Sequence, residues 1–217
     1  EPGYARAHAL LGWASWWMAH LRYFPDRSAE LFLKAAGHAK DALYFDPNDP
    51  WARMVSGLRL STSGHHERAL GELRTALRLN PSFALGRTTY GWALLRAGFF
   101  EEAIAETGRA LRMSPLDSFA GLYTSTHGLA LLAAQRFEEA LPFLRASIAA
   151  FAAYTGQYYQ LISCCGHLGL IDEAQELISD SRRIGGPPRL SEVRQVLAKY
   201  AHCDVFVEGL RKAGAPE

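Results

Sequence analysis

Two adjacent pairs of side chains in the sequence could act as ligands or nucleophiles: His65-His66 and Cys164-Cys165. Imidazole nitrogens bind zinc, and neighbouring thiols can cycle between a dithiol and a disulfide. A metal site needs further ligands nearby, and none is evident around the two histidines, so we expect them at a solvated turn. The cysteines occupy positions where small packing residues are expected. We interpret them as buried structural thiols, with a redox pair as the alternative.

A third candidate is His127, which precedes Gly128 in an apolar segment and is expected to be a packed histidine rather than a catalyst. The sequence contains no GxxxxGK[ST], HExxH or GxSxG motif. The three cysteines, with Cys203 the last, form neither a CxxC spacing nor a disulfide framework. We therefore expect no catalytic residues, no cofactor and no metal, and we predict that the chain is not an enzyme.

Composition excludes several classes of partner. The 217 residues are 49% apolar and 21% charged, as in an ordinary globular protein. With 23 basic and 22 acidic residues the net charge is +1, which argues against nucleic-acid binding. The longest apolar region, residues 9–21, is too short to span a bilayer, so no membrane association is expected. The cysteine usage favours a cytoplasmic protein. The chain begins with Glu1 and is interpreted as a fragment of a longer protein.

The elements that would position these residues repeat along the chain. The stretches "GHHERALGELRTALRLNP" (64–81) and "GFFEEAIAETGRALRMSP" (98–115) start 34 residues apart. An alanine shared by both recurs at a spacing of 34, 34, 37 and 34 residues, and a second small residue follows seven positions later. Small residues at these places would let two antiparallel helices pack closely. The first series is Ala35, Ala69, Ala103, Ala140 and Ala174, and the second is Ala42, Ala76, Ala110, Ser147 and Ser181.

Glycine and proline mark the helix ends. Gly64, Gly98 and Gly169 fall at the middle of their units, where a helix terminus adopts a left-handed conformation. Pro47, Pro81 and Pro115 end the first three units. A further glycine recurs within the first helix of the first four units, at Gly12, Gly57, Gly91 and Gly128. The repeat predicts units at 5–49, 50–83, 84–120, 121–154 and 155–186, with about eleven extra residues between the two helices of the first unit.

The pattern resembles the tetratricopeptide repeat (TPR), a helix–turn–helix unit of 34 residues. The resemblance implies an all-α protein, a right-handed α-solenoid of about five TPR helix hairpins covering residues 1–186. The repeat stops after residue 186, and helices are expected at 190–200 and 204–214. We predict that residues 187–217 form a two-helix C-terminal cap, because a stacked array leaves the apolar face of its last unit exposed.

In this repeat family, five positions of each first helix line a concave groove. All five tryptophans fall on such positions, and the lining is apolar where some TPR domains carry a polar clamp for carboxylate-terminated peptides. Such peptides are therefore not expected as ligands. Alternatively, the tryptophans of the first unit form the core of its long hairpin, and this alternative is favoured there; for Trp92 both remain open. The predicted protein-binding groove consists of Trp13, Trp17, Trp51, Leu58, Trp92, Leu95, Leu129, Leu132 and Tyr159.

Three further stretches carry a closer resemblance: the aromatic-rich "LLGWASWWMAHLRYFPDRS", the linker "FDPNDPWA" and the ending "FVEGLRKAGAPE". Together they resemble the C-terminal TPR region of bacterial proteins that carry a class III adenylate cyclase domain or a winged-helix DNA-binding domain. The resemblance implies a regulatory, protein-binding module of a signalling protein. Its partner would be a protein or peptide in the groove, or an upstream domain of the same chain. A homodimerisation module and a small-molecule-sensing groove are the alternatives.

Overall fold

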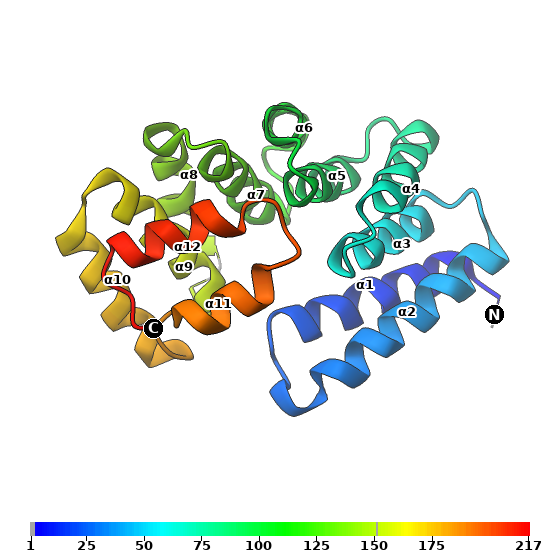
Figure 1. The fold of residues 1–217 in the computed structure, drawn as a ribbon. Helices are drawn as coiled ribbons and strands as arrows, with labels where there is room; N and C mark the ends of the chain where they lie inside the picture. Colours follow the sequence, from blue (N-terminus) through cyan, green and yellow to red (C-terminus); the bar gives the residue numbers. More distant parts are fainter. Residues whose placement is uncertain (1–2, 151) are drawn as a thin grey trace. The chain divides into compact units, whose positions relative to one another are not determined.

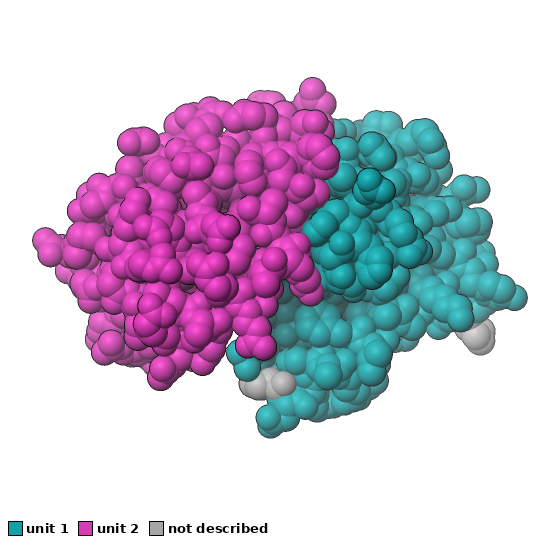
Figure 2. All heavy atoms as spheres, viewed as in Figure 1, with its two compact units in different colours: residues 1–93 teal, residues 94–217 magenta. Residues whose placement is uncertain are grey.

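The computed structural model describes residues 3–150 and 152–217, and all regular structure within these residues is helical. The all-α fold class predicted from the sequence is therefore confirmed. Contacts divide the chain into two compact units, residues 1–93 and 94–217 (Figure 2). The boundary falls inside one helix. None of the helices in the described part of the chain is long and apolar enough to cross a membrane.

The first unit is built from two helix hairpins (Figure 1). The first helix packs along the second, the third packs along the fourth, and the third also contacts both helices of the first hairpin. The extra residues of the first hairpin lengthen its helices to 16 and 18 residues and add a short 3-10 turn, η1, at Pro25–Arg27. The helices are α1 (Ala5–His20), α2 (Ser28–Phe45), α3 (Pro50–Thr62) and α4 (His66–Leu79), followed by α5 (Ala84–Ala97), which enters the second unit.

In the second unit, each helix from α6 to α10 packs against the next, so that hairpins follow one another along the chain. The last helix departs from this order because it packs against α9 and α7 (Figure 1). The helices are α6 (Phe100–Met113), α7 (Ala120–Ala133), α8 (Phe137–Ala150), α9 (Thr155–Leu168), α10 (Ile171–Ile184), α11 (Leu190–Leu197) and α12 (Cys203–Lys212).

Small residues hold the two helices of a hairpin together. Every alanine and serine of the two repeated series is buried. The glycine of the first helix serves the same contact, since a Cβ on Gly57 would lie 2.5 Å from Leu73 Cγ on the partner helix. A larger side chain at such a crossing would push the helices apart. The repeated small residues are therefore the structural reason for the 34-residue period.

The turns and helix ends agree with the sequence signals. Gly64, Gly98 and Gly169 have φ angles of +82°, +95° and +71°, as predicted for left-handed helix termini. In the fourth hairpin the same position is Gln135, with a φ angle of +60°. This left-handed conformation is energetically unfavourable for a residue that has a Cβ. The helices α2, α4 and α6 each end two residues before a proline.

Candidate functional site

The tryptophans of the first unit come together around Trp16. This indole is 1% exposed, and its Nε1 donates a hydrogen bond to Thr62 Oγ1 at 3.1 Å. His20 stacks on it with ring centroids 4.5 Å apart. Trp16 belongs to a buried cluster with Ala35 and Leu58, which are 1% and 2% exposed. The indole at the centre is thus a core residue of the first unit.

The other four tryptophans surround this centre and remain partly exposed. Trp92 lies edge-on to Trp16 at 5.4 Å and stacks on Trp17 at 5.9 Å, between ring centroids. Trp13 contacts both Trp17 and Trp51, at 5.9 and 6.2 Å. We call Trp13, Trp17, Trp51 and Trp92 the tryptophan surface. Trp16 is therefore the buried centre, Trp13, Trp17 and Trp92 pack against its cluster, and Trp51 packs against the neighbouring cluster of Ala9, Ala42 and Ala52. The role of these residues in binding stays a prediction.

In the second unit, the predicted groove residues are mostly covered. Leu95, Leu129 and Leu132 are 0%, 7% and 0% exposed. Tyr159 is partly exposed, and its hydroxyl donates to the Gly186 carbonyl oxygen at 3.0 Å. These leucines pack inside the unit in this structure, so a partner could reach them only after a rearrangement. Their role in binding stays a prediction.

The chain's own C-terminal helix occupies the first-helix surface of the second unit. Ser163 Oγ donates to the Phe206 carbonyl oxygen at 2.9 Å, and His167 Nε2 donates to the Val205 carbonyl oxygen at 2.7 Å. Ser163 and His167 lie on α9, which is the first helix of the predicted unit 155–186. A third bond, from Gln175 Nε2 to the Ala213 carbonyl oxygen at 2.6 Å, anchors the end of α12 to α10.

Two glycines allow this docking. A Cβ on Gly166 of α9 would overlap the carbonyl oxygen of Gly209 on α12, and a Cβ on Gly209 would overlap the backbone of Ser163. The two helices therefore touch backbone to backbone. The apolar side of α12 is buried through Phe206, Val207 and Leu210, whereas its Asp204, Arg211 and Lys212 are exposed. The α12 helix is thus amphipathic, and its apolar side packs closely against the rest of the second unit.

The segment that leads into α12 covers a buried arginine. Arg96, at the end of α5, is 4% exposed and lies under the Tyr200 ring, 4.7 Å from the ring centroid. Its carbonyl oxygen accepts a hydrogen bond from the Ala201 amide at 2.9 Å. His202 is 3% exposed, and burial, together with the nearby Arg96 charge, lowers its pKa to about 3. His202 is therefore neutral at physiological pH, so it adds no second charge beside Arg96.

The chemical candidates from the sequence occupy unreactive settings. Cys164 and Cys165 are fully buried free thiols, and burial raises the pKa of each to about 12, so neither forms a thiolate readily. His127 Nδ1 lies 2.8 Å from Thr107 Oγ1, and burial lowers the His127 pKa. His65 is exposed at the residue before α4, in agreement with the predicted solvated turn, whereas His66 is the first residue of α4 and is partly buried.

The sequence interpretation missed the residues that hold α12. Gly166 and Gly209 were the available signal, because a glycine inside a helix weakens it and often marks a close approach. Whether residues 187–217 cap the array stays a prediction. In the structure, α12 packs mainly against α9, the first helix of the last hairpin, and it also contacts α7.

Comparison with known proteins gives the fold. No family model and no curated protein matches the chain. A solved structure of PilF from Pseudomonas aeruginosa superposes with a TM-score of 0.66 at 17% identity, over 97% of this chain and 88% of that one. PilW, described as a widely conserved type IV pilus biogenesis factor, gives 0.65 at 18% identity, with 90% of each chain covered. YrrB, described as a TPR protein with an unusual peptide-binding site, gives 0.55 at 22% identity, over 81% and 90%. The chain therefore has a TPR-like helical fold.

Proposed function

We propose that this chain is a protein–protein interaction module whose first helices bind amphipathic helices. The observation that carries the proposal is the packing of α12 on α9 and α7. Side chains of α9 donate hydrogen bonds to main-chain carbonyls of α12, and a glycine on each of α9 and α12 allows the close contact. Helix-in-groove recognition is a common mode of peptide binding, with apolar anchors at helical spacing. In this chain, Phe206 and Leu210 have that spacing and are both buried.

In the first unit, the corresponding surface is the tryptophan surface, which the first helices α1, α3 and α5 carry. Its indoles are half-buried and fixed by one another, so they lose little freedom when a partner binds. Tryptophan is enriched among the residues that dominate binding energy at interfaces. We propose this surface as the site for the external partner, a helix with apolar side chains on one face.

The finer context rests on the resemblance of the sequence to TPR regions of bacterial cyclase and winged-helix regulator proteins. On that basis we propose a regulatory role in a bacterial signalling protein in the cytoplasm. Three buried free thiols are compatible with a reducing compartment. The peptide-binding site named for YrrB supports a peptide or protein ligand by analogy of fold.

The test places a photo-crosslinking amino acid at Trp51 or Trp13 in the full gene product, expressed in its own host. Tyr44 is the matched control, since it is an aromatic residue on α2 that is 81% exposed. We expect both tryptophan positions to crosslink to the same short segment, with apolar residues three and four apart. A synthetic peptide of that segment should then bind the purified chain, and Trp51→Ala should weaken binding at least tenfold, the scale of an interface anchor.

The outcomes separate the alternatives. Crosslinks to a second copy of the chain, with a dimer in sedimentation, would support a homodimerisation module instead. A small molecule that protects both positions from crosslinking would support a sensing groove. If Trp13, Trp51 and Tyr44 give the same products, the tryptophan surface is not a binding site.

A further inference from the structure

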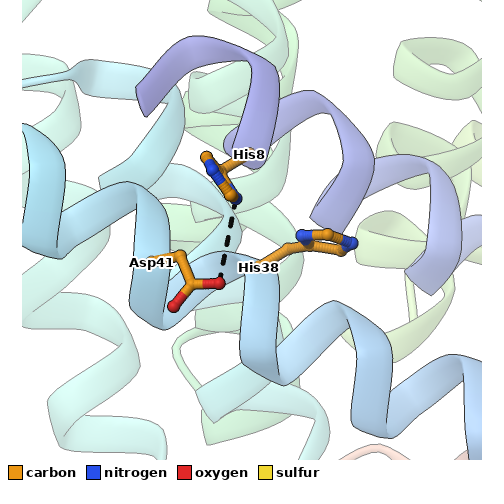
Figure 3. Close-up of side chains that lie close together, drawn as sticks. All are labelled: His8, His38 and Asp41. Carbon is orange, nitrogen blue, oxygen red and sulfur yellow. Dashed lines mark ion pairs between the residues drawn. The ribbon is translucent and has the colours of Figure 1, made fainter. Parts of the chain in front are cut away.

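We propose that His8, His38 and Asp41 form a binding site for a divalent transition-metal ion of the zinc type. The three side chains meet between the helices of the first hairpin (Figure 3). His8 comes from α1, and the other two come from α2. One donor atom from each residue lies within 4.8 Å of the others, which is the arrangement a shared cation requires.

Local structure places these donors together. His38 and Asp41 are three residues apart on α2, so they lie on the same side of that helix. Gly12 follows His8 by about one turn and brings α1 close to α2, since a Cβ on Gly12 would lie 3.3 Å from the His38 Cβ. The Phe45 ring, 5.2 Å from the His8 ring between centroids, confines the first imidazole from another side.

The distances need only small side-chain movements for a metal. His8 Nδ1 and Asp41 Oδ2 are 3.8 Å apart, and the two imidazole centroids are 5.7 Å apart. Metal–ligand bonds of about 2.0–2.2 Å in a tetrahedral site put donors roughly 3.3–3.5 Å from each other. The Asp41 side chain is 53% exposed, so its carboxylate can turn toward the imidazoles without disturbing the core.

A second observation points to a ligand. Nδ1 of His38 is buried, and no residue among those the structure describes offers it a hydrogen bond. A buried polar atom without a partner is unfavourable for folding, and such an atom in a native protein calls for an explanation. A bound cation would supply the missing interaction, because a neutral imidazole nitrogen is a good metal ligand.

The donor set selects the class of metal. Two imidazole nitrogens and one carboxylate oxygen suit Zn²⁺, and also Co²⁺, Ni²⁺ and Cu²⁺, whereas Mg²⁺ and Ca²⁺ prefer oxygen ligands alone. Three protein ligands leave the fourth position to water. The ion would join α1 to α2 in the hairpin that carries Trp13 and Trp17. Its direct effect would be to stabilise this hairpin, since a ligand bound only by the folded state raises stability.

The experiment titrates the purified, metal-free chain with Zn²⁺ by calorimetry and with Co²⁺ by visible absorption. We expect one ion per chain and ligand-field bands of low-coordinate Co²⁺ that Zn²⁺ displaces, with no heat from Mg²⁺. Asp41→Asn and His38→Gln should each weaken Zn²⁺ binding at least tenfold. The matched control His65→Gln, at an exposed turn, should bind as the parent does.

Thermal unfolding supplies an independent readout. Saturating Zn²⁺ should raise the melting temperature of the parent and of the His65→Gln chain, and this rise should be lost in Asp41→Asn. Because Asp41 is at the surface, that variant is expected to fold, which circular dichroism of the metal-free chain would verify. Binding weaker than millimolar, or equal binding by the parent, Asp41→Asn and His38→Gln, would overturn the proposal.

Discussion

Replacing Gly209 by alanine should detach α12 from α9. The new Cβ would overlap the backbone of Ser163 and lie 2.6 Å from His167 Cδ2, where ordinary carbon contacts are 3.4 Å or more. A backbone carbonyl cannot rotate away as a side chain can. The helix α12 must therefore move by about an ångström, because each atom occupies a fixed van der Waals volume. That movement breaks the hydrogen bonds from Ser163 and His167 to the carbonyls of α12.

The size of the effect follows from three contributions. Loss of two hydrogen bonds costs about 0.5–1.5 kcal/mol each. Overpacking of a close contact costs typically about 1–3 kcal/mol. Alanine is a better helix former than glycine by about 1 kcal/mol, which offsets part of the loss. We expect the Gly209→Ala change to lower the free energy of unfolding by about 3 kcal/mol, the middle of these ranges.

Urea unfolding and hydrogen exchange measure this effect. Gly37→Ala is the control, since Gly37 is exposed on α2 and a Cβ there meets nothing within 4 Å. The same substitution should there raise stability by up to about 1 kcal/mol. In Gly209→Ala, the amides of α12 should lose protection while those of α3 and α4 keep it. If both variants gain stability and α12 stays protected, the backbone contact described for Gly166 and Gly209 does not hold the helix.

Further expectations concern His202, the thiols and the fourth turn. Because burial lowers the His202 pKa from 6.5 to about 3, protons favour the unfolded chain below pH 6.5, and stability should fall by about 2 kcal/mol between pH 6.5 and 5. In His202→Phe, the urea midpoint of unfolding should change less between pH 6.5 and 5. An unchanged pH dependence would mean that other groups cause it. Cys164 and Cys165 should react with a disulfide reagent at pH 8 only after unfolding, and rapid native labelling would contradict their burial. Gln135→Gly should raise the melting temperature by relieving a left-handed residue worth about 1 kcal/mol, whereas Gly98→Ala should lower it.

The hairpins could be predicted from the sequence because their determinants are local and repeated. Ala69 and Ala103 are required wherever two helices of a hairpin cross, so the same residue type returns with the period. Gly64 and Gly98 report left-handed turns in the same way. Each signal involves residues that are near one another in the chain. Because the same signals recur in several units, each unit supports the assignment of the others.

The surfaces were harder to predict because they depend on which segments return to cover them. The repeat identifies α9 as a first helix, but nothing in the 34-residue period says that α12 lies on it. His8 and His38 are thirty residues apart, and only the close packing of α1 on α2 at Gly12 brings them together.

The covalent link between α12 and the surface it covers sets a threshold for any competitor. A segment tethered through a short connection experiences an effective concentration on the order of millimolar. A free helix that binds the same surface of α9 must therefore have a higher concentration or a higher affinity than the tethered α12, which stays close to this surface. If the second unit binds an outside helix at this place, as proposed, weak and nonspecific helices would be excluded. Any change that loosens α12 would then raise the apparent affinity of every such partner by the same factor.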